Sequence, residues 1–328
     1  ILAVIFSVEK YHSHHRDLWN AFVASSKNAT FLFQRNFIEY HQDRFDEHSY
    51  IIYKKTKPFA LLPANKNKKK LISHQGLSYG GLILQPDAKF KDVLNSFVTL
   101  LEQINDDGFS NLIIKTIPKI YHDLPSDEMD YLLFKTKANL LRRDLSSVIE
   151  TQRSLEIQSS NRKRGLKRAL NAELEILESL DFKMFWNDIL IPNLKSRHQV
   201  TPTHSLEEII KLHAYFPKNI RQFNVFNKQT LVAGVTIFES KHVAHVQYIS
   251  GNDEKQKLGS LDMIFDHLIN NVYKTKKYFD FGISNESSGH FVNEGLISWK
   301  ESFGARSIAI DTYSIDTKNH HKLRHTLI

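Results

Sequence analysis

The stretch from Tyr278 to Ala305 combines residue types that often build an active site. Tyr278 to Gly282 is aromatic and bounded by glycine, which predicts a short buried strand. A polar loop, Ile283 to His290, follows it, and the pattern then predicts a helix over Asn293 to Ser302 with Asn293 as its N-cap. A strand end that leads through a polar loop to a helix N-terminus is where α/β proteins usually place their site. We therefore expect chemistry at this loop.

Two side chains in this half of the chain are candidate proton acceptors, Glu286 and His245. Glu286 lies in the polar loop, and its alternative interpretation is an exposed loop acid. His245 lies between Ala244 and Val246 on a predicted strand, so it is alternatively a core histidine with satisfied hydrogen bonds. Asp280 is expected to fix the strand end rather than to act in catalysis.

A glycine turn precedes the strongest predicted helix of the chain, Leu261 to Tyr273. Gln256, Gly259 and Ser260 stand directly before that helix. The first turn of a helix has free N–H groups and the positive end of the helix dipole, so such a turn can bind a phosphate. The alternative is an ordinary glycine turn without a ligand.

Basic and aromatic residues elsewhere suggest an acceptor site. Arg162 and Arg164 lie on a predicted basic helix over Ser159 to Ala172, where they could clamp a phosphate or simply face solvent. Tyr79 lies within a glycine-interrupted strand pattern, Leu71 to Leu84, and could line an acceptor cleft or pack as a strand residue.

The composition of the chain excludes several kinds of site and favours certain partners. The chain has 328 residues, enough for two domains, and no cysteine, which excludes disulfides, thiolate metal sites and a cysteine nucleophile. Its net charge of +8 favours anionic partners such as phosphates, CoA, nucleotide sugars, tRNA or membrane headgroups. No apolar run approaches the ~18 residues of a membrane span, and Ile1 to Val8 is expected to be a first strand. We expect a cytoplasmic monomer without stable membrane insertion.

Two histidine clusters in the sequence are candidate metal sites. They comprise His12, His14 and His15, and His320, His321 and His325. Neither has a carboxylate partner on a predicted strand, so the sequence predicts no metal site. Walker, nucleophile-elbow and dinucleotide glycine motifs are absent from the sequence.

The two halves of the chain show the same predicted order of elements: a strand, two helices, a run of antiparallel strands, a helix and a strand. We interpret this as a duplicated α+β unit, with a first unit over residues 1–150 and a second over residues 151–328. The boundary is expected near Asp144 to Gln158, and the C-terminal tail is expected to pack back on the first unit.

Several stretches resemble the FemAB-like branch of the GNAT acyltransferase superfamily, whose members have two tandem GNAT-like units. The resemblance rests on the glycine-rich stretch His74 to Ile83, the basic helix start Ser160 to Ala169, the Phe-Asp-Phe-Gly strand Phe279 to Gly282, and the helix Asn293 to Gly304. Two departures are visible: Leu261 stands where the phosphate loop has a small residue, and Trp299 replaces a phenylalanine.

The resemblance implies a fold of two GNAT-like units, each a mostly antiparallel mixed sheet flanked by helices, with the first unit degenerate. It implies transfer of an acyl or aminoacyl group to an amine of a cell-envelope or nucleotide-sugar acceptor. The co-substrate would be acyl-CoA or aminoacyl-tRNA, with no covalently bound cofactor. No coiled-coil arm of the kind seen in some family members is visible, which weighs against tRNA.

The resemblance also assigns roles to residues. Lys300 matches the lysine of the family's Phe-Lys motif and is expected to stabilise donor phosphate or developing charge; the alternative is a solvated helix lysine. Glu286 and His245 are the candidate bases. The expected donor-binding residues are Gln256, Gly259, Ser260 and Asn293, and the expected acceptor-binding residues are Tyr79, Arg162 and Arg164. The rival hypothesis is a degenerate double unit that binds an anionic glycan precursor or RNA without catalysis.

Overall fold

The computed structural model describes residues 5–153 and 159–328. The chain forms two compact units: the first comprises Ile1–Asp144 and Ala309–Ile328, and the second comprises Leu145–Ile308. Residues 1–4 of the predicted first strand and residues 154–158 of the predicted boundary lie outside the described residues.

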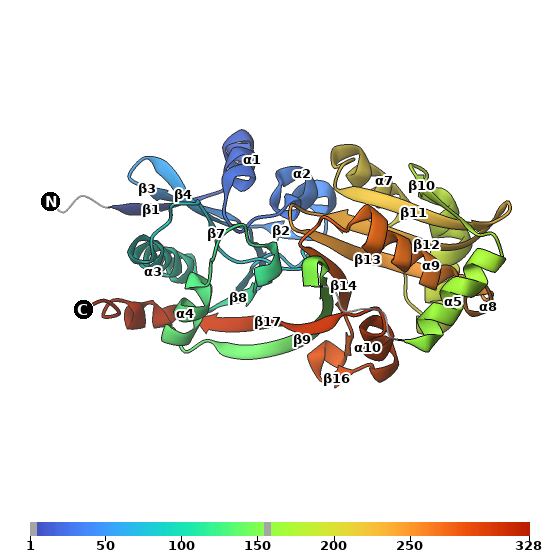
Figure 1. Ribbon diagram of the computed structural model, residues 1–328. Coiled ribbons are helices and arrows are strands. Elements are labelled where there is room, and N and C mark those ends of the chain that lie inside the picture. Colours follow the sequence, from blue (N-terminus) through green and yellow to red (C-terminus); the bar gives the residue numbers. More distant parts are fainter. Residues whose placement is uncertain (1–4, 154–158) are drawn as a thin grey trace. The chain divides into compact units, whose positions relative to one another are not determined.

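The first unit contains two sets of paired strands (Figure 1). One set has the order β1-β3-β4-β7 and is antiparallel throughout. The other has the order β2-β5-β6-β8-β17, in which only β6 and β8 are parallel. The strands are β1 (Phe6–Lys10), β2 (Asp46–Glu47), β3 (Tyr50–Lys54), β4 (Lys57–Leu62), β5 (Asn65–Asn67), β6 (Lys70–Ile72), β7 (Ile83–Leu84), β8 (Asn111–Lys115) and β17 (Arg306–Asp316).

The α-helices of the first unit are α1 (Arg16–Ser25), α2 (Arg35–Ile38), α3 (Phe90–Asp106) and α4 (Glu128–Lys135). Its 3-10 turns are η1 (Ser13–His15), η2 (Phe31–Phe33), η3 (Glu39–His41), η4 (Lys119–Tyr121) and η9 (Thr317–Leu323). The predicted C-terminal helix, Thr317 to Ile328, is thus a shorter 3-10 segment. The core forms around α3, whose apolar residues recur every three or four positions and include Val93, Phe97 and Leu100, all fully buried.

The second unit has the strand order β10-β11-β12-β13-β14-β9. Its neighbouring strands are antiparallel except for β13 and β14, which are parallel. The strands are β9 (Asn139–Glu150), β10 (Glu175–Ser179), β11 (Ile220–Asn227), β12 (Thr230–Glu239), β13 (Val243–Gly251) and β14 (Tyr278–Ile283), with a separate hairpin of β15 (Asn285–Glu286) and β16 (Phe291–Val292).

The helices of this unit are α5 (Ser160–Asn171), α6 (Ile191–His198), α7 (Leu206–Tyr215), α8 (Lys255–Leu258), α9 (Ser260–His267) and α10 (Glu294–Glu301). Two π-helical segments, η6 (Phe185–Leu190) and η7 (Leu268–Val272), and the 3-10 turns η5 (Thr151–Arg153) and η8 (Ser287–Gly289) complete it. The predicted helix over Leu261 to Tyr273 is therefore partly π-helical.

Helical segments cover both faces of the second unit's sheet. Val235 and Ile237 of β12 belong to the same buried cluster as Phe265 of α9. Gly234 faces the other way, because alternate strand residues point to opposite faces, and a Cβ on it would lie 2.4 Å from the Phe185 ring in η6. The expected α+β fold, with antiparallel-rich sheets flanked by helices, is confirmed. Among the described residues, no helix is long and apolar enough to cross a membrane.

Candidate active site

The parallel strands β13 and β14 separate in the middle of the second unit. They pair only from Val243 with Tyr278 to His245 with Asp280. Beyond Asp280 the register of β14 against β9 shifts, and Gly282 takes a φ of +76°, a conformation that favours glycine. A Cβ on Gly282 would lie 3.3 Å from Cε1 of His245, so the glycine also leaves room for that ring.

His245 and Asp280 form a hydrogen-bonded dyad at the last pair before the strands separate. Nδ1 of His245 lies 2.8 Å from Oδ2 of Asp280. Asp280 is only 2% exposed, and its Oδ1 accepts the hydroxyl of Ser146 at 2.6 Å and the amide of Gly282 at 2.8 Å. Three atoms of the surrounding residues therefore hold one buried carboxylate in a fixed orientation.

The electrostatics of the dyad favour a base at Nε2 of His245. Burial by itself raises the pKa of Asp280, but His245 and the hydrogen bonds from His245, Ser146 and Gly282 bring that pKa below its usual value. An ionised carboxylate can only accept hydrogen bonds, so Nδ1 of His245 is the donor, and Nε2 has the lone pair whenever the ring is neutral. The same orientation of an imidazole by a buried carboxylate is used in serine hydrolases.

We expect the stability contribution of Asp280 to depend on pH. Because its pKa is lowered in the native state, the unfolded chain binds more protons between the two values, so the contribution is present above about pH 4 and is lost as the pH falls. The difference in free energy of unfolding between the wild type and Asp280→Asn should therefore shrink below about pH 4. Urea denaturation at pH 7, 5 and 3 measures it, and a difference independent of pH would contradict the lowered pKa.

Lys300, the predicted catalytic lysine, is buried beneath the end of β14. Its Nζ donates hydrogen bonds to the carbonyl oxygens of Gly282 at 2.8 Å and Ile283 at 2.7 Å. Burial lowers the pKa of Lys300 to about 8, partly offset by the negative charge of Asp280. In this structure the lysine holds the irregular end of β14 next to the dyad. Its expected role toward the donor stays a prediction.

Replacing Lys300 with methionine should reveal this anchoring. Loss of two charge-assisted hydrogen bonds to carbonyl oxygens should lower the free energy of unfolding by about 2 kcal/mol. Thermal and urea denaturation measure the effect, with Lys257→Met as the control, because Lys257 is 79% exposed and has only an i,i+3 ion pair. Equal stability of both variants would show that the anchor contributes nothing.

Glu286 and Asn293, predicted for different roles, lie together at the edge of the β15–β16 hairpin. Both are exposed, and Nδ2 of Asn293 donates to Oε1 of Glu286 at 2.7 Å. Oδ1 of Asn293 accepts the amide of Leu296 at 2.9 Å, so Asn293 is the N-cap of α10 as predicted. The structure thus gives Asn293 a capping role and leaves one carboxylate oxygen of Glu286 at the surface.

The predicted phosphate turn has the backbone of a tight helix start. Gln256 is exposed on the single turn of α8, and Gly259 adopts a left-handed φ of +72° before α9 begins at Ser260. A Cβ on Gly259 would lie 2.0 Å from the carbonyl oxygen of Gly165, so glycine is required there for two reasons. Ser260 is fully buried, and its hydroxyl has no hydrogen-bond partner among the described residues.

The basic helix α5 packs directly on this turn. Arg162 pairs with Asp262 in the first turn of α9, and Nη2 of Arg168 donates to the carbonyl oxygen of Gln256 at 2.9 Å. Burial raises the pKa of Asp262, and Arg162 works against that rise. The structure therefore places Arg162, predicted for the acceptor, beside the predicted donor turn. Arg164 is exposed and bonds to Asn161.

Tyr79 lies in the core of the first unit. It is 5% exposed, its hydroxyl lies 3.0 Å from Oγ1 of Thr30, and its ring packs against Phe33 and Tyr121 with centroids at 5.8 and 4.7 Å. These contacts match the alternative interpretation, in which Tyr79 packs as a strand residue. The part of Tyr79 in acceptor binding stays a prediction.

The sequence did not indicate Asp280 as the partner of His245, or Ser146 as a partner of Asp280. Asp280 does fix the strand end, through its bond to the amide of Gly282, but the same carboxylate also orients the imidazole. Only the parallel register of β13 and β14 brings these two residues opposite each other, and no local sequence pattern states that register.

Comparison with solved structures identifies proteins that share the fold of this chain. No family model matches the chain, and no curated protein matches it in sequence. Among solved structures, FemX aligns with a TM-score of 0.64 and 10% identity over 96% of this chain and 99% of its own. L-PGS of Bacillus licheniformis aligns with a TM-score of 0.60 and 11% identity over 94% and 93% of the two chains.

Two further solved structures share the fold of this chain. The C-terminal domain of a putative lysylphosphatidylglycerol synthetase from Agrobacterium fabrum aligns with a TM-score of 0.58 and 11% identity over 95% of each chain. A tandem GNAT protein from the clavulanic acid biosynthesis pathway aligns with a TM-score of 0.51 and 7% identity over 95% of this chain and 98% of its own. At these identities the likeness establishes architecture alone, and the chain shares its fold with FemX and with the tandem GNAT protein.

Proposed function

We propose that this protein is an N-acyltransferase that moves an acyl or aminoacyl group from an activated carrier to an amine of a cell-envelope or nucleotide-sugar acceptor. The observation that carries the proposal is the His245–Asp280 dyad at the point where β13 and β14 separate. The fold shared with FemX supports it, and the neighbour named as a putative lysylphosphatidylglycerol synthetase supports an acceptor in the envelope.

The reaction needs few groups. The nitrogen of the neutral acceptor amine attacks the donor carbonyl carbon, and a C–N bond forms while the C–S bond of an acyl-CoA or the C–O bond of an aminoacyl ester breaks. Nε2 of His245 takes the proton that the amine loses, and Asp280 stabilises the resulting imidazolium. The imidazolium of His245 then returns this proton to the leaving thiolate or alkoxide. Because the amine attacks the donor carbonyl directly, no covalent enzyme intermediate is required.

The donor phosphates are proposed to bind at the turn of Gln256, Gly259 and Ser260. The proposed ligands of the phosphate oxygens are the amides in the first turn of α9 and the Ser260 hydroxyl, which is buried and has no hydrogen-bond partner among the described residues. Arg162 and Arg168 add positive charge beside the turn. Acyl-CoA and aminoacyl-tRNA both offer phosphates to such a turn, so an experiment must distinguish these two donors.

The remaining predicted residues receive proposed roles from their positions. Lys300 is proposed to act as a positioning residue that holds Gly282 beside His245, in addition to its expected electrostatic effect on the donor. Glu286, kept at the surface by Asn293, is proposed to attract the acceptor ammonium as a second candidate base. Arg164 and Tyr79 remain proposed acceptor contacts.

A transfer assay tests the proposal. Purified protein is incubated with acetyl-CoA, longer acyl-CoA or aminoacyl-tRNA and a panel of amine acceptors, and N-acylated products are detected by mass spectrometry. Transfer by the wild type that is lost in His245→Ala supports the proposal. Absence of transfer with every donor, together with RNA binding that weakens steeply with salt, would instead support the non-catalytic binding protein.

A further inference from the structure

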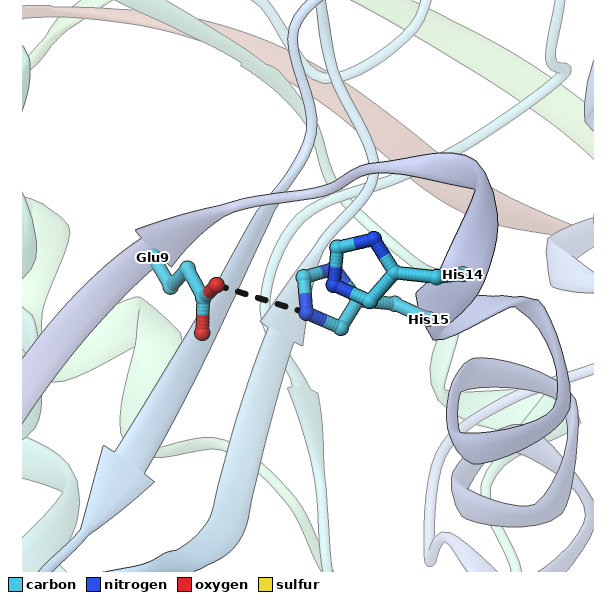
Figure 2. Close-up of side chains that lie close together, drawn as sticks. All are labelled: Glu9, His14 and His15. Atoms are coloured by element: carbon cyan, nitrogen blue, oxygen red, sulfur yellow. Dashed lines mark ion pairs between the residues drawn. The ribbon is translucent and has the colours of Figure 1, made fainter.

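A cluster of potential metal ligands lies in the first unit, outside the proposed active site. Glu9 is on β1, and His14 and His15 are on the 3-10 turn η1 that follows it (Figure 2). One ligand atom from each of the three residues lies within 4.8 Å of the other two. Figure 2 shows the carboxylate of Glu9 and the imidazole of His15 pointing toward each other, with the ring of His14 beside them.

The spacing fits a small tetrahedral ion. Zinc bonds of about 2.1 Å at tetrahedral angles place neighbouring ligand atoms about 3.4 Å apart. Oε1 of Glu9 and Nε2 of His15 are 3.4 Å apart. The rings of His14 and His15 have centroids 3.9 Å apart, and His14 is exposed, so its side chain can adjust to reach a common ion.

The surroundings hold one of the three ligands. His15 is 7% exposed, and its Nδ1 accepts the backbone amide of His12. Burial raises the pKa of Tyr53 on the neighbouring strand β3, and the negative charge of the nearby Glu9 raises that pKa further. The exposed Glu9 and His14 leave the cluster open to an ion from solvent.

We propose that Glu9, His14 and His15 form a zinc site, with water in the fourth position. Two imidazoles and one carboxylate favour Zn²⁺ over Mg²⁺ or Ca²⁺, which prefer sets made of oxygen atoms. The sequence predicted no carboxylate partner for these histidines, because Glu9 lies just after the expected first strand, Ile1 to Val8. In the structure β1 extends to Lys10 and brings Glu9 close to the η1 turn.

Zinc binding must rearrange one hydrogen bond. Nδ1 of His15 accepts the backbone amide of His12 at 3.1 Å, so the neutral ring carries its proton on Nε2, which faces Glu9. An ion bound to Nε2 displaces that proton, and the ring becomes protonated at Nδ1 instead. The His12 amide then loses its acceptor and turns to water, which is accessible because His12 is exposed. This change of tautomer is a signature that nonspecific surface binding would not produce.

Titration of the metal-stripped full-length protein with zinc chloride tests the site. We expect one ion per chain by isothermal titration calorimetry, at least a tenfold loss of affinity in His14→Ala and in Glu9→Gln, and wild-type affinity in His321→Ala, which removes an exposed histidine of the other cluster. Both altered ligands are exposed, so circular dichroism should show intact folding. Nitrogen NMR of the wild type should show His15 protonated at Nε2 without zinc and at Nδ1 with it.

Two results would overturn the proposal. One is the same zinc affinity in His14→Ala as in His321→Ala, which would mean that zinc binds elsewhere on the surface. The other is equal affinity for magnesium and zinc, which would mean that the imidazoles do not coordinate the ion. A higher melting temperature with zinc in the wild type but not in Glu9→Gln would add support, because a ligand that binds only the native state stabilises it.

Discussion

His245→Ala should lower the turnover number for acyl transfer by about 10² to 10⁴, the usual contribution of a positioned general base. The reason is geometric: Asp280 holds Nδ1 of His245 as a donor, which leaves Nε2 as the ring nitrogen that can accept a proton, in a side chain that is 22% exposed. The KM for the donor should change little, because the proposed donor turn starts at Gln256, beyond the end of β13. Steady-state kinetics with the donor identified in the transfer assay measure both quantities.

Two further measurements make this prediction specific. Added imidazole should restore part of the activity of His245→Ala, since it can occupy the vacated space and accept the proton. His267→Ala removes a histidine at the end of α9 and should leave turnover unchanged. Comparable loss in both variants, or no loss in His245→Ala, would remove His245 from the mechanism and leave Glu286 as the candidate base.

Gly259→Val should destabilise the second unit by about 3 kcal/mol or more. A branched residue in the left-handed region costs about 1–2 kcal/mol, and overpacking a close contact costs about 1–3 kcal/mol. The contact is severe, because the added Cβ would lie 2.0 Å from the carbonyl oxygen of Gly165, which is backbone and cannot rotate away. Urea denaturation measures the loss, and donor affinity should fall at least tenfold in the protein that remains folded.

Gly295→Ala provides the matched control for this change. Gly295 lies in the first turn of α10 on the exposed surface, and the nearest atom to an added Cβ is Oδ1 of Asn293 at 3.7 Å. Alanine has a better helix propensity than glycine, so this variant should be slightly more stable than the wild type, by up to ~1 kcal/mol. If Gly259→Val and Gly295→Ala both change the free energy of unfolding only slightly, α5 and α9 can move apart where they cross.

Local patterns predicted most elements of the second unit. The basic helix from Ser159 to Ala172 is α5, with Ser159 as the N-cap that accepts the amide of Arg162. Gly259 ends α8 and opens α9 as its sequence position suggested. The π-helical segments were not predicted, because the i→i+5 pattern is chosen by packing of side chains such as Phe185 against the sheet and not by local preference.

The amino-acid sequence by itself determined the helix starts, the glycine turn and the strand–loop–helix over Tyr278 to Ser302, because those features depend on contacts between residues a few positions apart. The tertiary structure decided the partners of the site. His245 meets Asp280 across 35 positions, Ser146 meets Asp280 across 134, and Arg162 meets Asp262 across 100. Such pairs are set by strand register and helix packing, which depend on burial of the whole core. No periodic pattern in the sequence therefore indicates them.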